Sequence, residues 1–454
     1  MFIQSVALSQ QESMEFILSD IHIEGNKRTK DYVILRELEF QSEDTIAYSE
    51  EEKLWIENEN RLLSTGLFTY VDINREEGDN FVMIQVQENW FIYPNFIFEL
   101  ADRNFNVWWN EQGKSLDRVN IGGRINWLNV SGHRDRLKLT AQVGYTRRID
   151  LEYGFPYVNK AKTLGISAAV VYTENDEIGY KTIGNKTLFY SGDDDRIVLS
   201  RFRVASWVNY RPKLYGNHFV KLEYHRNVID DFVAQELNQD YFLNGLSTLR
   251  FFKLEYDFSF DKRRFTFYPE GGHSYGVSVQ KEGLGIFNEY NNLLVEIRGE
   301  HYTNIKDKII IANLVKLKTN LIRAQIGFAN NTGLGYNGNV VSGYELFVVD
   351  GTDFALTKSS VRWKMTDHLL NLDGLMPLRQ FKKMNIKAYL SFNIDTGFVN
   401  EPTYRDTNFL NNRLLLGYGP GLDIILFNTH LFSFEYSFNH LGQSALFFGN
   451  SVSF

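Results

Sequence analysis

The stretch Leu431–His440, LFSFEYSFNH, decides the fold because its side chains alternate with a period of two. One face of the stretch is entirely aromatic: Phe432, Phe434, Tyr436 and Phe438. The opposite face is polar: Ser433, Glu435, Ser437 and Asn439. A period of two is typical of a β-strand. Four adjacent rings opposite a carboxylate and an amide indicate a strand that lies between lipid and a wet interior.

The same alternation occurs twice upstream. In the first case, apolar residues oppose polar ones over 137–146: Leu137, Leu139, Ala141, Val143 and Tyr145 against Lys138, Thr140, Gln142 and Thr146. In the second, the apolar face over 252–260 is Phe252, Leu254, Tyr256, Phe258 and Phe260. The chain is therefore predicted to be an all-β transmembrane β-barrel. A large soluble all-β protein is the alternative.

Composition agrees with a barrel and excludes several other classes. Apolar residues make up 43% of the chain and the mean hydropathy is −0.30. A barrel has such values because its polar lumen residues offset its apolar lipid-facing residues in the average. Aromatic residues reach 15%, which suits girdles at two membrane interfaces. No apolar run approaches the roughly 18 residues that a spanning helix needs. The chain has no cysteine, and its net charge of −8 provides no basic stripe, so no nucleic acid partner is expected.

The first part of the chain has a different pattern, typical of a small α+β module over residues 14–89. We expect strands over 16–23, 70–75 and 81–86, and a short helix over 31–38. A second helix is expected to begin with a capping box formed by Ser49 and Glu52, and to end at Gly66. Its core face is predicted to be Leu54, Ile56, Leu62 and Leu63. Residues 1–13 are interpreted as a signal-peptide remnant or a frayed tail.

Two phrases in this module carry a resemblance to a known family. The segment Ile23–Thr29, IEGNKRT, and the segment Leu62–Phe68, LLSTGLF, resemble the recurrent phrases of POTRA domains in order and spacing. The positions that carry the match are Gly25, Asn26, Thr29, Gly66 and Phe68. POTRA domains precede the barrels of the BamA/TamA-type outer-membrane assembly superfamily, also called the bacterial surface antigen family. The resemblance implies a short member of it, with one POTRA domain.

The remaining residues, 90–454, resemble the barrel of that superfamily. Their length fits about sixteen spanning strands and alone allows about fourteen to eighteen, while the resemblance implies sixteen. Phe258–Gly272, Phe392–Gly397 and Gly417–Leu422 match barrel phrases of the family in the expected order. The proposed lumen-loop motif comprises Ser342, Gly343, Tyr344, Gly351, Arg362, Asp395 and Gly397.

One position departs from the family pattern. The family places an arginine at position 342, which would point into the lumen and pair with the wall carboxylate expected at Asp395, but this chain has Ser342. Lys358 or Arg362 is expected to substitute as the cation. The departure places the inward fold of the loop, and full insertase activity, in question, and a plain loop turn is the alternative for Ser342–Tyr344.

The two ends of the barrel form a predicted seam. The first strand is expected near Tyr93 to Leu100 and includes Pro94, Phe96 and Phe98, while the C-terminal signature includes Gly449, Val452 and Phe454, with Phe447 as a mismatch. The last strand is expected to close against the first. Proline removes a ladder donor and glycine packs nothing, so both weaken the seam, unless they merely lie at strand ends. A weak seam suits a lateral gate whose strand edges template another chain.

The resemblance implies a protein of the outer membrane, with its POTRA domain in the periplasm, that assembles, inserts or translocates client polypeptides. A two-partner-type secretion pore and an inactive accessory barrel are the alternatives. Expected partners are unfolded client proteins, periplasmic or lipoprotein partners and outer-membrane lipid. No motif of a hydrolase, a metalloprotease or a nucleotide-binding enzyme is present, so neither enzymatic activity, nor a cofactor, nor a metal site is expected.

Overall fold

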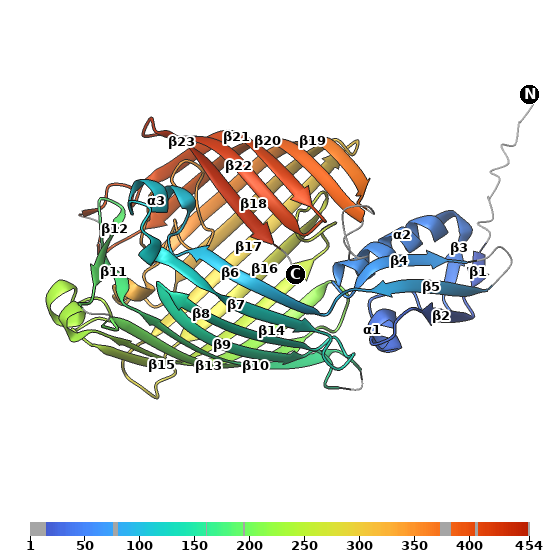
Figure 1. The fold of residues 1–454 in the computed structure, drawn as a ribbon, viewed down its shortest axis with the longest axis horizontal. Coiled ribbons are helices and arrows are strands. Elements are labelled where there is room, and N and C mark those ends of the chain that lie inside the picture. The colour runs from blue at the N-terminus through green and yellow to red at the C-terminus, as the bar shows by residue number, and fades with distance from the viewer. Residues whose placement is uncertain are drawn as a thin grey trace, which may run out of the picture. The chain divides into compact units, whose positions relative to one another are not determined.

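The structure is a computed structural model that describes residues 15–75, 80–159, 161–193, 196–372, 383–404 and 407–452. It divides into two compact units, coloured from blue to red along the chain in Figure 1. The first unit extends to Phe91 and includes Asn129–Arg134, and the second comprises Ile92–Leu128 and Asp135–Phe454. The predicted tail over 1–13 and most of the turn after Arg75 lie outside the described residues.

The first unit is an α+β module. Its elements are β1 (Glu15–Ile17), β2 (Asp20–Glu24), α1 (Asp31–Leu35), β3 (Thr45–Ala47), α2 (Tyr48–Ser64), β4 (Phe68–Asn74) and β5 (Phe81–Glu88). The strand β2 pairs in parallel with β5, and β5 pairs antiparallel with β4, which makes a sheet in the order β2-β5-β4. The short strands β1 and β3 form a separate antiparallel pair.

Three predictions for this module differ from the structure. The strand expected over 16–23 is two strands, because β1 leaves the main sheet to pair with β3. The helix α2 begins at Tyr48 after Ala47, without a side-chain cap, so the predicted capping box is wrong. Its buried positions are Trp55, Asn58 and Leu62, whereas Ile56 and Leu63 are exposed. The helix does end as predicted, with Gly66 at a φ of 72° directly after the C-cap Thr65.

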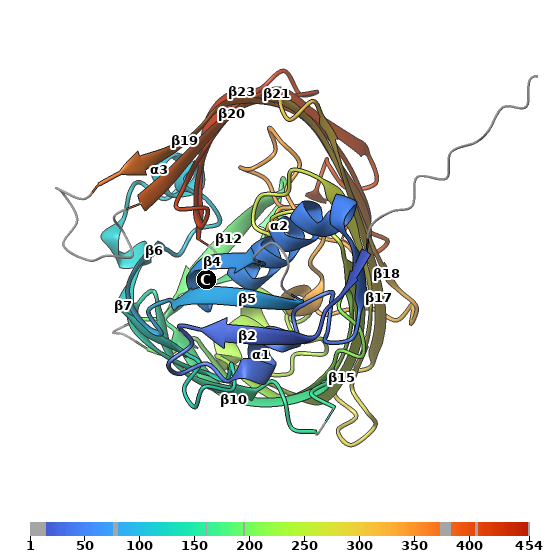
Figure 2. The same cartoon turned by 90° about the vertical axis from the view of Figure 1, so that its right-hand side faces the viewer.

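The second unit is a sixteen-stranded antiparallel sheet that forms the barrel. Its strands curve around a shared interior (Figure 2). In sequence order they are β6 (Ile92–Leu100), β7 (Val119–Leu128), β8 (Arg136–Gly144), β9 (Thr146–Phe155), β10 (Leu164–Asn175), β13 (Leu199–Tyr210), β14 (Gly216–Ile229), β15 (Thr248–Asp261), β16 (Gly272–Glu282), β17 (Asn292–Ile305), β18 (Ile309–Asn320), β19 (Asp353–Asn371), β20 (Lys383–Asn400), β21 (Leu414–Leu426), β22 (His430–Asn439) and β23 (Ser444–Val452).

The strands show the alternation that the sequence predicts. In β22, Phe434 and Tyr436 are exposed while Ser437 and Asn439 are buried. In β8, Leu139 and Val143 are exposed while Thr140 is buried. An outward apolar row on strands whose backbone groups are paired is a surface suited to lipid. No helix among the described residues is both long and apolar enough to cross a membrane.

The longer connections gather at one end of the barrel, here called the loop end, where β6, β10, β14, β18 and β20 finish. They contain α3 (Phe105–Asn110), η1 (Leu116–Arg118), the hairpin of β11 (Glu177–Ile183) and β12 (Lys186–Ser191), the π-helical turn η2 (Val233–Leu237) and η3 (Phe328–Asn330). We call the opposite end the turn end.

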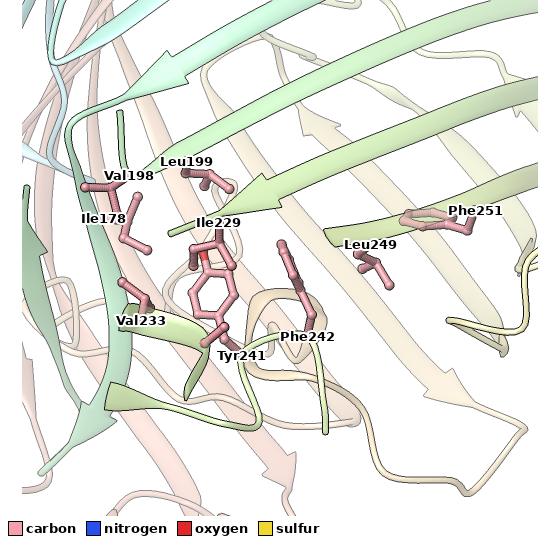
Figure 3. Close-up of a cluster of buried hydrophobic side chains, with 10 residues drawn as sticks. Ile178, Val198, Leu199, Ile229, Val233, Tyr241, Phe242, Leu249 and Phe251 are labelled. Atoms are coloured by element: carbon pink, nitrogen blue, oxygen red, sulfur yellow. The ribbon is translucent and has the colours of Figure 1, made fainter. Parts of the chain in front are cut away.

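An apolar core supports the loop end. Side chains from β11, from the ends of β13, β14 and β15 and from the η2 connection meet there, as Figure 3 shows. They include Ile178, Leu199, Ile229, Val233 and Phe242, each at most 5% exposed. A second buried cluster joins the β18–β19 connection to the strands β19, β20 and β21. These cores fix the loop segments that form the candidate site.

Candidate functional site

The β18–β19 connection, residues 321–352, folds inward and is anchored on the barrel wall. The backbone N–H and the hydroxyl of Ser342 both donate to Oδ2 of Asp395 on β20, at 3.2 and 2.8 Å. The Lys358 ammonium on β19 lies 3.5 Å from the same oxygen. Asp395 is only 3% exposed, so these contacts supply the partners that a buried carboxylate requires.

Glycines let the loop backbone approach the wall closely. Gly343 has a φ of 80°, a left-handed conformation that favours glycine. A Cβ on Gly417 of β21 would lie 1.6 Å from the carbonyl oxygen of Ser342, so any side chain at 417 would push the loop away. Gly397 faces Val341 in the same way, at 2.6 Å. Gly351 lies at the foot of the loop, where a Cβ would collide with Val399.

The loop is also tied to the end of β22. The carbonyl of Gly343 accepts a hydrogen bond from Nδ2 of Asn439 at 2.6 Å. The buried Tyr344 ring packs in the apolar cluster of the loop, and its hydroxyl contacts Nδ1 of His440. The tripeptide Ser342–Tyr344 therefore joins β20, β21 and β22 from inside the barrel.

The other candidate cation for Asp395 is engaged elsewhere. The guanidinium of Arg362 on β19 stacks over Tyr268 at 4.4 Å and lies 5.8 Å from the Tyr302 ring. Tyr268 belongs to the β15–β16 connection, and its hydroxyl donates to Asp423 on β21 at 2.7 Å. Of the two predicted substitutes, Lys358 thus lies at the carboxylate and Arg362 does not.

A buried ion-pair cluster lies around Glu270 at the turn end. Glu270 accepts from the Lys364 ammonium at 2.6 Å, from the Lys387 ammonium at 3.0 Å and from the Tyr389 hydroxyl at 2.7 Å. Burial alone would raise the pKa of Glu270, but these three donors outweigh it and lower the pKa to about 2. The β15–β16 connection is thereby bound to the inner faces of β19 and β20.

Asparagines close the loop end. Asn185, at the tip of the β11–β12 hairpin, is fully buried and has a φ of 59°. Its side chain donates to the Val348 carbonyl and to Oδ1 of Asn411, both at 2.9 Å, and accepts from the Leu410 N–H at 2.9 Å. The hairpin tip therefore connects the β18–β19 and β20–β21 connections across the barrel mouth. This contact could not be predicted from the sequence, because an asparagine that follows a glycine indicates only a turn.

The seam contains no ladder over the described residues. Within the described residues, β6 pairs only with β7, and β23 pairs only with β22, so the first and last strands form no ladder with each other. Pro94 lies within β6 opposite Ile125, and Gly449 lies within β23 opposite Ser433, so neither residue is at a strand end. The rings of Phe96 and Phe98 are exposed, as outward positions require.

The C-terminal signature is partly described. Leu446 and Phe448 are exposed, whereas Phe447 between them is 9% exposed and lies on the inner face. The mismatch at Phe447 therefore places an aromatic ring on the side that polar groups usually occupy. Val452 pairs in register with His430, and Phe454 lies outside the described residues. Tyr93 lies in β6 opposite Asn126.

Comparisons with known proteins agree with both units. Residues 16–89 match the family model described as POTRA, surface antigen variable number repeat. The structure of BamA from Haemophilus ducreyi lacking POTRA domains 1–3 is similar, with a TM-score of 0.54, 14% identity, and coverage of 96% of this chain and 85% of that chain. CdiB from Escherichia coli gives 0.52 at 10% identity, covering 100% and 93%. This chain joins a POTRA domain to a barrel with the fold of BamA and CdiB. No curated protein sequence matches it.

The POTRA phrases build the turns of the domain. Gly25 has a φ of 94°, and a Cβ there would lie 1.9 Å from the Val86 carbonyl oxygen, so only glycine fits. The Asn26 side chain donates to the Thr29 carbonyl at 2.9 Å and to the Asp31 carboxylate at 2.7 Å. Thr29 is buried, and its hydroxyl accepts from Asn129 at 2.9 Å.

The POTRA sheet has two edges, β2 and β4, of which β4 contains the outer strand predicted from Tyr70. Phe68 at the start of β4 is buried, and Tyr70 is half exposed. Within the described part of the chain, no cluster of three or more histidine, aspartate or glutamate side chains is arranged to hold a metal.

Proposed function

We propose that this chain is an outer-membrane protein-assembly factor that offers the edge of its last barrel strand, β23, to unfolded client polypeptides. The observation that carries the proposal is the absence, over the described residues, of a ladder between β6 and β23. A strand edge at membrane depth that joins no second ladder is costly, so the edge of β23 is a strong template for an added strand. A client strand that pairs with an edge gains backbone hydrogen bonds without a specific sequence.

The composition of the two edges supports reversible pairing. Pro94 removes one donor from β6, and Gly449 contributes no side chain to cross-strand packing on β23. A seam made from these strands lacks one backbone donor and one packing side chain. A client strand therefore competes for the edge of β23 with β6, which is a poor pairing partner.

The POTRA domain completes the proposal. With the domain in the periplasm, the exposed edge of β4 provides a second surface for extended client segments or for periplasmic and lipoprotein partners. The chemistry is strand pairing against outer-membrane lipid. It requires neither an enzymatic step nor a cofactor.

A disulfide across the seam tests the proposal, because the native chain has no cysteine. One cysteine replaces Phe96 or Phe98 on β6 and the other replaces Leu446 or Phe448 on β23, all exposed positions that leave the lumen unchanged. We expect oxidised pairs to stop the folding of an unfolded barrel protein into proteoliposomes, and reduction to restore it. Client folding at the unlocked rate in fully oxidised protein contradicts the proposal.

A matched control separates seam closure from general stiffening. Phe434→Cys with Phe448→Cys places a cross-strand pair within the β22–β23 ladder, where these two residues are direct partners. This disulfide leaves the β6–β23 seam open. We expect client folding to continue in the control after oxidation.

A secretion pore is the second candidate, favoured by the charged interior. A cavity of about 260 Å³ is lined by charged side chains that include Lys138, Arg148, Asp150, Arg203 and Lys221, a lining that favours water over lipid. The inward loop and the Asn185 contacts favour assembly instead, because they obstruct that path. Ion conductance in planar bilayers distinguishes the two: a large steady conductance favours the pore, and a small one favours assembly.

The third candidate function, an inactive accessory barrel, predicts a different result for variants of this chain. This alternative was suggested by the serine at position 342, where the family has an arginine. Ser342 nevertheless contacts Asp395 directly. If Ser342→Arg and seam-locked variants both leave every envelope phenotype unchanged, the accessory role is favoured.

A further inference from the structure

The short helix α3 lies beside the open edge of β23. It belongs to the β6–β7 connection and covers only Phe105–Asn110, too few residues to be stable alone in water. Asn104 caps it, with Oδ1 accepting from the Val107 N–H at 2.9 Å. A helix of this length therefore keeps its position through tertiary contacts.

One contact of α3 is made with the edge strand itself. Nδ2 of Asn106 donates to the backbone carbonyl of Leu446 at 2.8 Å. Leu446 lies in β23, which pairs on its other side with β22, where Tyr436 is its partner. A side-chain amide thus occupies an acceptor on a strand that no ladder from β6 reaches within the described residues.

The base of α3 is held by the inward loop. Nη1 of Arg103 donates to the Phe347 carbonyl at 2.7 Å, and Nδ2 of Asn104 donates to the Glu345 carbonyl at 2.6 Å. These acceptors follow Ser342, which is anchored on Asp395, by three and five residues. A continuous series of contacts therefore runs from the barrel wall through the loop and α3 to the edge of β23.

The contacts of α3 are few enough for the helix to detach from β23. Val107 is the only side chain of α3 that is buried, and it lines a cavity of about 260 Å³ together with Arg103, Tyr241 and Tyr336. Moving α3 away therefore exposes little apolar surface, while the bond from Asn106 to Leu446 is a single neutral hydrogen bond.

We propose that α3 is a removable clasp that covers the loop end of the β23 edge and is held in place by the inward loop. An extended client strand displaces the clasp when it pairs with β23, and loosening the Ser342 anchor releases it as well. The proposal rests on the proposed function for the identity of the displacing strand. The clasp itself is a property of the unoccupied protein.

Distance measurements between spin labels test the clasp without a client. Labels are attached to Trp109→Cys on α3 and Leu441→Cys in the β22–β23 connection, two exposed positions in a chain without native cysteine. The doubly labelled protein is expected to show one narrow, short distance distribution. Adding Asn106→Ala is expected to raise the ratio of long to short distances about fivefold, the effect of losing one typical hydrogen bond.

Two further variants complete the test. Asn110→Ala removes the same side chain from an exposed position of the same helix and is expected to leave the narrow distribution unchanged. Ser342→Ala removes the hydroxyl that binds Asp395 and is expected to broaden the distribution because it weakens the loop anchor. A distribution that stays narrow and short in Asn106→Ala overturns the clasp. Because no client is present, this result is independent of whether the seam lock stops client folding.

Discussion

The contacts of Ser342 could be predicted from the sequence only in part. The motif Ser342–Tyr344 and the wall residue Asp395 were identified from the resemblance, and the structure brings them into contact. The partner set was not predictable, because it depends on how closely the loop backbone approaches the wall. That approach is possible only because Gly417 has no side chain beneath the Ser342 carbonyl. Because the loop backbone lies so close to the wall, the hydroxyl and backbone N–H of Ser342 reach Asp395 without the long side chain of an arginine. Lys358 supplies the positive charge.

Glu270 carries a residue-scale prediction. Glu270→Gln removes the charge that faces Lys364 and Lys387, and it leaves two ammonium groups close together in a mostly buried site. We expect the free energy of unfolding, measured by denaturant titration in detergent, to fall by about 3 kcal/mol. The pair of Glu289 with the exposed Arg250 provides the control, since Glu289→Gln is expected to change stability much less.

The same carboxylate gives a pH dependence with a definite sign. Because the folded state lowers the pKa of Glu270 from 4.5 to about 2, its stabilisation is present above pH 4.5 and is lost as the pH falls toward 2. The Glu270→Gln variant is therefore expected to lack this part of the acid-induced loss of stability. A stability difference between the two proteins that is the same at pH 3 and pH 7 contradicts the assignment.

At the scale of elements, the strands were far more predictable than the helices. A barrel strand repeats its lipid and lumen faces every two residues, so β8, β15 and β22 were evident from alternation alone. The core face of α2 differs from the prediction because the segment after α1 packs on the helix: Trp55 contacts Phe40, and Asn58 accepts from the Glu39 N–H. The β11–β12 hairpin and α3 lie within loops, where no periodic membrane surface marks them.

The β11–β12 hairpin carries a prediction at this scale. Asn185→Gly keeps the positive φ but removes the side-chain bonds to Val348, Leu410 and Asn411. We expect the connections at the loop end to separate more often, which raises ion conductance in planar bilayers and accelerates protease cleavage in the β18–β19 connection. Ile183→Ala, an exposed position of the same hairpin, is the control. Equal conductance of Asn185→Gly and the unaltered protein would argue against the hairpin as a closure.

At the scale of the whole molecule, alternation predicted the barrel and length allowed about fourteen to eighteen strands. The sheet has sixteen, the number that the resemblance implied. The expected closure of the last strand against the first appears as no ladder over the described residues. Periodicity says which residues face lipid, but it contains no information on whether two particular edges pair. That outcome depends on the balance between a weak ladder, with Pro94 and Gly449 in it, and the contacts that α3 makes with β23.

The central claim is that client polypeptides pair with the open edge of β23. A photoreactive amino acid at Leu446 or Phe448 tests it most directly, with Val220 on β14 as a control that is equally exposed but lies between two ladders. Proteoliposomes receive an unfolded outer-membrane barrel protein from urea and are then irradiated. We predict crosslinks to the client from positions 446 and 448 and none above background from position 220. Equal yields from all three positions, or none from the β23 positions while the client folds, would contradict the account.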